Sequence, residues 1–346
     1  MDGPRFLVSA LAITLVACGG GGSSDFDPSD GATAPLTSAA GAEAPTSAGH
    51  GECQQWQSRQ PDWIWCDDFE SGRSLAEKYG RANIGAAAHA DSLEHSSRYA
   101  ADGGHALRFT YAAFDGSDAS RDAGSLRRNF GRAPFADEPA YRGAPPHYAD
   151  EDFDEIYYRY YLRHAPGFRG GWPDKSSRAF VLADGRDPWG PQAMVAHLWT
   201  IDQGATLGVD PVSGVDPDSG RLLTRRWNDM GQFRWLNKGR PAGSQLGRTP
   251  LNDQAWQCIE ARVRLNRVDP VAADGLQQFW VDGEPQLDNP PQRLNFTGAW
   301  RDYGINGIQL ESYWNAGSPV VQDRYVDRFV ISRSRIGCGA APEATP

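Results

Sequence analysis

The sequence predicts an all-β protein, a two-sheet sandwich with long loops at its rim. Between residues 51 and 340 the strongest apolar periodicity is two, which is typical of half-buried strands. The chain contains 39 glycines and 24 prolines, which favours many turns over long helices. Strand-like segments recur along this region with turn signals between them, as in sandwiches and jelly rolls.

The first 50 residues are predicted to lie outside this β domain. Residues 1–18 contain an arginine and then an apolar run too short to span a membrane, as in a signal peptide. Residues 19–50 carry few large apolar side chains, so we expect a disordered Gly/Ser/Ala linker. The apolar run ends in LVAC, which resembles the lipobox of bacterial lipoproteins. That resemblance implies lipidation of Cys18, with an ordinary secretory signal as the alternative.

Composition limits the partners and the location of the protein. A formal net charge of −10 argues against binding nucleic acid, whose phosphates require a basic face. After residue 18 no segment is apolar enough to cross a bilayer, so a lipid anchor would be the only membrane contact. The lipobox resemblance, with no aspartate after Cys18, implies an outer-membrane lipoprotein facing the periplasm or the cell surface. We expect a monomer.

The cysteine pattern predicts disulfides. Setting Cys18 aside leaves four cysteines in an exported chain, which indicates two bonds and allows three pairings. We favour a local bond between Cys53 and Cys66 and a longer one that joins Cys258 to Cys338. A zinc site is the weaker interpretation because no CxxC spacing occurs.

Two segments show the strand pattern most clearly. Residues 155–163 (EIYYRYYLR) alternate, so Ile156, Tyr158, Tyr160 and Leu162 are expected to face the core. Residues 258–266 place their aliphatic side chains on one face and Glu260, Arg262 and Arg264 on the other. Further strands are predicted at 106–111, 179–183, 195–201, 277–282, 307–313 and 325–332. Residues 202–254, rich in Gly, Asp, Pro and Arg, are predicted to form rim loops.

Several of these segments resemble a known family. Residues 65–72 (WCDDFESG) look like the opening of concanavalin-like jelly rolls, and residues 103–108 (GGHALR) look like their next strand. Residues 155–168 are similar to the central strand of jelly-roll polysaccharide lyases of the alginate- and glucuronan-lyase type. Residues 280–283 and 325–332 fit the last strands. The resemblance implies a concanavalin-like jelly roll, a scaffold that lectins, hydrolases and lyases share.

A uronate lyase needs a group that neutralises the carboxylate, a base for the C5 proton and an acid for the leaving oxygen. We expect the outward face of residues 155–163 to supply part of this set, together with a histidine on a neighbouring strand. The candidate catalytic residues are His197, Tyr161 and Tyr157. The candidate substrate-binding residues are Arg159, Arg262, Glu260, Gln309, Trp199, Tyr313 and Trp314, the aromatic ones because sugar rings stack on them. Each has a purely structural alternative: a buried histidine, core aromatic residues or a cross-strand charge ladder.

The lyase resemblance adds three residues. Members similar to alginate lyases carry a lysine in a Gly-rich turn after the central strand, and Lys175 matches that position. Their Ser-x-Arg and Tyr-x-Tyr patterns are missing here, so a His197–tyrosine pair of the glucuronan type is expected instead. Glu70 and Asp327 match the positions that share a structural Ca²⁺ in such folds. No P-loop, GxGxxG or HExxH motif occurs, and no organic cofactor is expected.

Three functions therefore remain open at the level of sequence. The first is a surface-tethered polysaccharide lyase acting on an acidic glycan by β-elimination. The second is a carbohydrate-binding lipoprotein without catalysis. The third is a glycoside hydrolase that would use Glu260 and Glu311, since hydrolysis needs two carboxylates facing one another across a groove.

Overall fold

A computed structural model describes residues 51–80, 84–85, 93–96, 99, 101, 104–134, 147–184, 189–201, 205–236, 245–251, 255–287 and 293–339. They belong to the second of two units into which the chain divides, residues 44–346. Cys18 and the predicted linker lie outside the described residues. No helix in the described part is long and apolar enough to cross a membrane.

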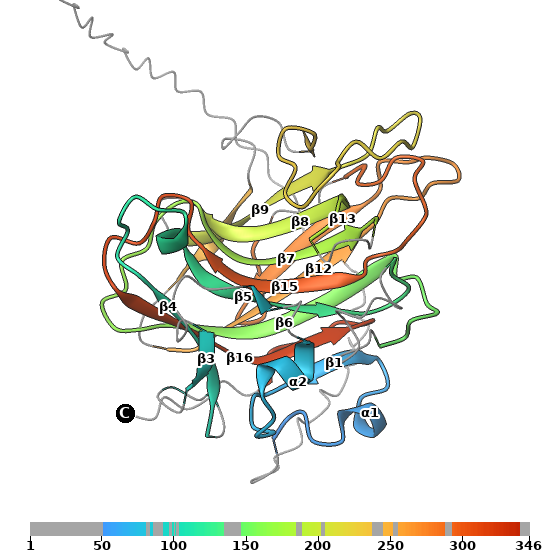
Figure 1. Cartoon of the computed structure of the whole chain (residues 1–346). Helices are drawn as coiled ribbons and strands as arrows, with labels where there is room; N and C mark the ends of the chain where they lie inside the picture. Colours follow the sequence, from blue (N-terminus) through green and yellow to red (C-terminus); the bar gives the residue numbers. More distant parts are fainter. Residues whose placement is uncertain are drawn as a thin grey trace, which may run out of the picture. The chain divides into compact units, whose positions relative to one another are not determined.

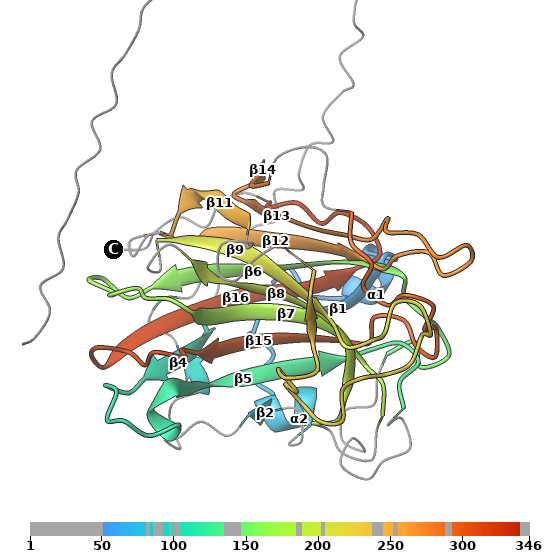
Figure 2. The ribbon, with the colours of Figure 1, turned by 90° about the horizontal axis from the view of Figure 1, so that it is seen from above.

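The described residues form two antiparallel sheets packed face to face, as the sequence predicted (Figures 1 and 2). In sheet A the order is β14-β13-β12-β6-β16-β4-β3, and β1 pairs with one end of β16. Its strands are β1 (Trp63–Asp67), β3 (Leu93–Ser96), β4 (Ala106–Tyr111), β6 (Glu155–His164), β12 (Gln257–Arg264), β13 (Leu276–Val281), β14 (Glu284–Pro285) and β16 (Gln322–Ser332).

In sheet B the order is β10-β9-β8-β7-β15-β5-β2, and β11 pairs with β9. Its strands are β2 (Ile84–Gly85), β5 (Asp122–Asn129), β7 (Asp174–Leu182), β8 (Gln192–Ile201), β9 (Thr206–Ser213), β10 (Arg234–Trp235), β11 (Gln245–Pro250) and β15 (Gly307–Tyr313). The helices are short: α1 (Trp56–Arg59), α2 (Leu75–Tyr79) and the 3₁₀ turn η2 (Ala119–Arg121).

The predicted alternation of β6 is confirmed. Ile156, Tyr158, Tyr160 and Leu162 are fully or almost fully buried in the core between the sheets. The tyrosine hydroxyls have hydrogen-bond partners there, because hydroxyls of the facing strand β7 lie within hydrogen-bond distance. The Tyr160 hydroxyl is 2.7 Å from the Ser176 hydroxyl, so the core is tied together by polar as well as apolar contacts.

The prediction of rim loops throughout residues 202–254 is wrong in part. This region contributes β9, β10 and β11, which together extend sheet B beyond β8. Between β9 and β10 the chain makes an excursion at residues 214–233. Both ends of this excursion connect to strands of sheet B, so its residues lie beside that sheet.

Both predicted disulfides are confirmed, Cys53–Cys66 and Cys258–Cys338. The bonds fasten the two ends of the described chain to the outer face of sheet A, the face that does not contact sheet B. At the N-terminal end, Glu52 accepts a 2.5 Å hydrogen bond from the Arg159 guanidinium. Two disulfides are typical of an exported protein.

Candidate functional site

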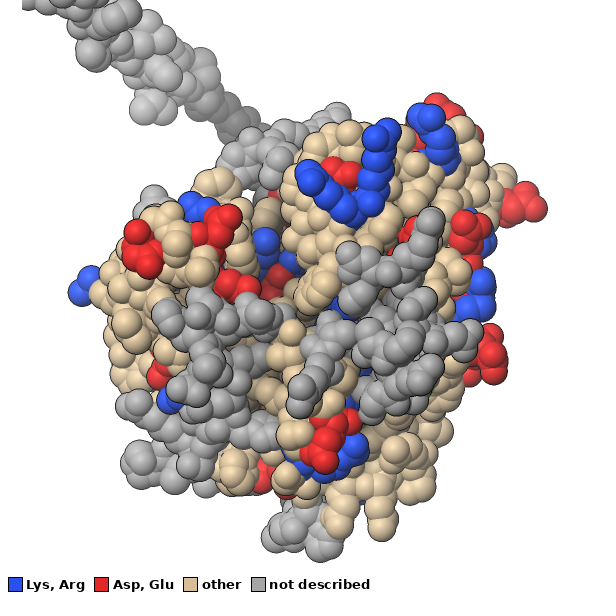
Figure 3. Space-filling view, in the orientation of Figure 1, with Lys and Arg blue, Asp and Glu red and all other residues tan. Residues whose placement is uncertain are grey.

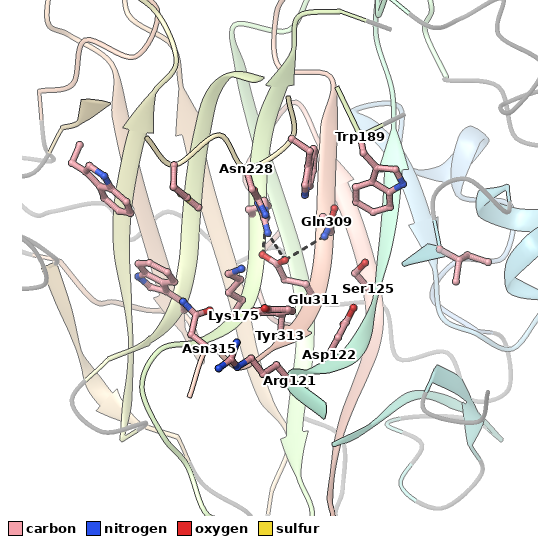
Figure 4. Close-up of a pocket in the computed structure, with 16 residues that line it drawn as sticks. Arg121, Asp122, Ser125, Lys175, Trp189, Asn228, Gln309, Glu311, Tyr313 and Asn315 are labelled. Carbon is pink, nitrogen blue, oxygen red and sulfur yellow. Dashed lines mark hydrogen bonds and ion pairs between the residues drawn. The ribbon is translucent and has the colours of Figure 1, made fainter. Parts of the chain in front are cut away.

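One groove lies on the outer face of sheet B (Figure 4). Figure 1 shows that the strands of this sheet are curved. The groove has a volume of about 750 Å³. Its floor crosses β8, β7, β15 and β5, and the excursion at 214–233 contributes one wall through Trp227, Asn228 and Met230. Figure 3 shows basic and acidic side chains close together where this face is hollowed.

A β-bulge in β7 determines which side chains enter the groove. The pairing with β8 shifts between Lys175 and Ser177, so one extra residue lies on the β7 side. Ser176 and Ser177 turn toward the core, where they contact the hydroxyls of β6. Lys175 and Arg178, three positions apart, therefore both face the groove.

An ion pair forms the centre of the floor (Figure 4). Arg178 donates two hydrogen bonds to Glu311 on β15, from Nε to Oε1 at 2.7 Å and from Nη2 to Oε2 at 2.5 Å. Its Nη1 donates to the Asn228 side-chain oxygen at 2.6 Å, which connects the floor to the wall. Gln309 donates to Glu311 at 3.3 Å. A bidentate pair of this kind fixes the guanidinium in one orientation.

Lys175 and Tyr313 lie together beside that ion pair. The Lys175 ammonium is 4.2 Å from the centre of the Tyr313 ring, and both side chains line the groove. Burial lowers the pKa of Lys175 to about 8, and the Arg178 charge acts in the same direction. Burial also raises the pKa of Tyr313, so its phenol stays protonated at neutral pH. The pair thus contains an amine that can lose its proton and a phenol that keeps it.

A carboxyl group of β5 lies near Lys175 and Tyr313. Asp122 pairs in register with Tyr313 and lines the groove. Burial is the main cause of the raised pKa of Asp122, and the charge on Glu311 raises it further, while Lys175 opposes both. The groove therefore holds two carboxyl groups, and the charged form of one is already disfavoured.

A buried network holds Lys175 from behind. Asp174, the preceding residue, forms an ion pair with Arg324 of β16, and both are 1% exposed. Tyr111 donates a 2.7 Å hydrogen bond to Asp174, and Arg324 donates to the Lys175 carbonyl at 3.0 Å. These bonds join the two sheets directly beneath the groove, so the backbone at Lys175 is fixed by the core.

Indole rings form the remaining surface of the groove. On the β8 side, Trp199 and Trp235 have parallel rings, 6.4 Å between centroids with 13° between planes. Near the wall, Trp189 and Trp227 meet edge to face at 4.9 Å. Three groove side chains leave polar atoms buried without a hydrogen-bond partner among the described residues, Nε of Arg121, Nε1 of Trp199 and Oε1 of Gln309. Such atoms are expected where a polar ligand binds.

Five of the residues selected from the sequence line this groove: Lys175, Trp199, Gln309, Glu311 and Tyr313. His197 lies on the same face of β8 but is fully buried beside Trp199, with ring centroids 5.1 Å apart. Its Nδ1 is 3.1 Å from the Asp210 carbonyl oxygen. A base must reach the sugar, so Lys175 is better placed for that role than His197.

The expectation that the outward face of β6 shares a groove with His197 is wrong. The residues concerned, Tyr157, Arg159, Tyr161, Glu260 and Arg262, all belong to sheet A, and none lines the groove. Tyr161 and Glu260 contact the C-terminal end of the described chain instead. The Tyr161 hydroxyl donates to the Cys338 carbonyl, and the Glu260 carboxylate accepts hydrogen bonds from the backbone amides of Ile336 and Gly337.

Three further expectations concern single residues. Trp314 belongs to the core, 2% exposed against Tyr111, and does not face the groove. Glu260 and Glu311 lie on different sheets, so the hydrolase pair inferred from the sequence does not form. Arg262 instead forms an ion pair with Glu155 at 2.5 Å, as expected for a cross-strand charge ladder.

The two predicted calcium ligands bind backbone amides near the start of β4. Glu70 accepts hydrogen bonds from Gly104 and His105, at 2.9 and 2.8 Å. Asp327 accepts one from Ala101 at 2.8 Å. Within the described part of the chain, no group of three or more Asp, Glu, His or Cys side chains converges on a point. These residues do not form a cation cage of their own, and structural calcium stays a prediction.

Comparison with known proteins supports no family assignment. No family model matches the sequence, and no curated protein matches it. Solved structures of similar fold include an alginate lyase of polysaccharide lyase family 14 from Aplysia kurodai, at 13% identity and TM-score 0.49, covering 78% of this chain and 98% of that one. The alginate lyase vAL-1 from a Chlorella virus has 14% identity and TM-score 0.46, covering 72% and 91%. An endo-β-1,4-glucuronan lyase from Trichoderma reesei has 12% identity and TM-score 0.46, covering 82% and 95%. These are similarities of fold.

Proposed function

We propose that this protein is a polysaccharide lyase that cleaves a uronate-containing glycan by β-elimination in the groove of sheet B. The observation that supports this most directly is the contact between Lys175 and Tyr313, in which burial lowers the pKa of the amine that would act as base and keeps the phenol that would act as acid protonated. A groove with indole walls and a few fixed polar groups is typical of a carbohydrate site.

In this proposal each step of the elimination is assigned to a residue of the groove. Neutral Lys175 removes the proton at C5 of the uronate, and the electron pair left there forms the C4–C5 double bond. The bond from C4 to the glycosidic oxygen breaks, and Tyr313 gives its proton to that leaving oxygen. The Arg178 guanidinium and the amide of Asn228 or Gln309 face the uronate carboxylate and stabilise the charge that grows on it.

The proposal is tested by incubating the protein with alginate, glucuronan and deacylated gellan. The ultraviolet absorbance of the unsaturated product should rise with at least one polymer. Lys175→Met and Tyr313→Phe should each lower kcat by roughly 10²- to 10⁴-fold, the usual contribution of a positioned acid or base. Tyr157→Phe is the matched control, because Tyr157 lies on sheet A and should leave kcat unchanged.

Two other results would contradict the proposal. Saturable binding without product would identify a carbohydrate-binding protein. New reducing ends without unsaturation would identify a hydrolase, and here the structure offers its own pair. Asp122, with its raised pKa, and Glu311 both line the groove. Loss of those reducing ends in Asp122→Asn would support this second candidate function.

We also propose that the protein is exported and anchored to the outer membrane through a lipid on Cys18. The LVAC sequence and the two disulfides support this. In cells fed a labelled fatty acid, the wild-type chain should take up label and the Cys18→Ser variant should not. Equal labelling of the two chains would contradict the anchor.

A further inference from the structure

We infer that the groove selects a glycan in which the reacting uronate lies between uncharged sugars, rather than a polymer in which every sugar is a uronate. This inference rests on the proposed lyase function and specifies its substrate class. It follows from how charge and aromatic surface are distributed on either side of Lys175.

The groove has no unpaired positive group for a second substrate carboxylate. Among the described lining residues the bases are Arg121, Lys175 and Arg178. Arg178 is neutralised by Glu311 at 2.5 Å, and Arg121 by Asp118 at 2.5 Å. Lys175 is the remaining base, and it is neutral when it acts on C5. Arg178 and the amides beside it therefore serve the carboxylate of the reacting uronate, and no further ammonium or guanidinium among the described lining residues is left for a row of carboxylates.

On the β8 side of the reaction centre the surface is uncharged. Trp199 pairs in register with Lys175, so a sugar bound over its ring lies next to the reacting uronate. Trp235 continues this surface with a parallel ring. Indole faces accept the C–H face of a neutral sugar, whereas a carboxylate pressed against them would lose its hydration without gaining a partner.

On the β5 side the surface repels a second carboxylate. Asp122 pairs in register with Tyr313, so it faces the sugar on the opposite side of the reaction centre from Trp199. Its ionised form is already disfavoured by burial and by Glu311. A neighbouring uronate carboxylate would lie beside Asp122 and disfavour its ionised form further. Like-charge contacts of this kind exclude competing ligands, which is how a site gains specificity.

The test compares polymers with a graded number of carboxylates. Alginate and glucuronan, in which every sugar is a uronate, are each taken in native form and after chemical reduction of half their uronates to neutral sugars, which keeps backbone and linkage. Deacylated gellan, whose uronates already lie between neutral sugars, stays in the series unmodified. We expect kcat/KM per remaining uronate to rise roughly fivefold, equivalent to about 1 kcal/mol. An unchanged or lower value on the reduced polymer would overturn the inference while the lyase function stands. No unsaturated product on any member of the series would instead contradict the proposed function.

Two variants separate the contributions of the two sides. Asp122→Asn should raise kcat/KM on the native polymer more than on the reduced one. Trp199→Ala should lower kcat/KM mainly on the reduced polymer, because the neutral sugar loses its stacking surface. Trp280→Ala is the control, because Trp280 lies on sheet A, with its ring centre 4.6 Å from the Arg335 guanidinium. This variant should not change the ratio of kcat/KM on the reduced polymer to kcat/KM on the native polymer. Equal effects of Asp122→Asn on both polymers would overturn the role of Asp122.

Discussion

At the scale of single residues, the bulge in β7 decides what the sequence could and could not reveal. Lys175 was identified through its family-like position, and it does line the groove. Arg178 escaped notice because the predicted strand began only at residue 179, whereas β7 begins at Asp174. Even with the correct start, strict alternation from Lys175 would put residue 178 on the opposite face. The bulge reverses that order after Lys175. Ser176 and Ser177 of this bulge pack against the hydroxyls of β6, a tertiary contact, so the local sequence pattern does not predict the bulge.

The pH dependence of the reaction is the prediction at this scale. Burial lowers the pKa of Lys175 to about 8; Arg178 adds to this, and Glu311, Asp122 and Asp174 oppose it. Because the base must be unprotonated, kcat/KM should rise as the pH passes through about 8 and then level off. Steady-state rates measured across this pH range would show the rise in kcat/KM. A flat profile there would argue that another group is the base.

The lowered pKa of Lys175 should also make the free energy of unfolding depend on pH, which gives an independent measurement of that pKa. The unfolded chain, in which the lysine pKa is near 10.5, binds the proton more tightly than the folded chain. The free energy of unfolding should therefore rise between about pH 8 and pH 10.5 in the wild type. In Lys175→Met that rise should be smaller.

At the scale of elements, the period of two was sufficient to locate most strands. Two strands, β4 and β15, have the predicted bounds, and the central strand β6 differs by one residue. The segment of β9 was predicted as loop because it contains Gly208, Asp210 and Pro211, residues that are depleted in strands. It forms a strand here because β8 supplies an eight-residue partner.

The network behind Lys175 gives the prediction at this scale. Asp174→Asn leaves the Arg324 guanidinium buried without its counter-ion and should lower the free energy of unfolding by about 3–5 kcal/mol. The control is Asp154→Asn, which removes an exposed pair with Arg301 and should cost about 0–1 kcal/mol. Urea unfolding measures both. Equal losses in the two variants would show that the buried network contributes no special stability.

At the scale of the whole molecule, the sequence predicted the sandwich and both disulfides, yet it placed the outward face of β6 and the residues around His197 in one groove, although they lie on different sheets. The polar tyrosine–arginine face of β6 has the composition of a glycan site. In the structure the same groups bind the chain ends, as Arg159 does with Glu52 and Tyr161 with Cys338. Hydrogen-bonding capacity can be read from a strand, but the identity of its partner depends on which segments fold back over it.

The two disulfides should contribute unequally to stability. By the loop-entropy relation, the bond Cys258–Cys338, with a separation of 80 residues, contributes about 4.5 kcal/mol, and Cys53–Cys66, with 13, about 2.9 kcal/mol. Replacing both cysteines of a pair by serine should therefore lower the thermal midpoint more for the first pair. Calorimetry would check this. Because both bonds lie on sheet A, each variant should keep the wild-type KM at a temperature where it remains folded.

The attachment of both chain ends to sheet A has a consequence for how a tethered form would work. Glu52 and Cys338 are fastened to the side of the sandwich that faces away from the groove. If the chain is anchored through Cys18 as proposed, the tether would reach the sandwich at Gly51, on the side of sheet A. The groove of sheet B lies on the other sheet, so this attachment uses none of the described groove residues.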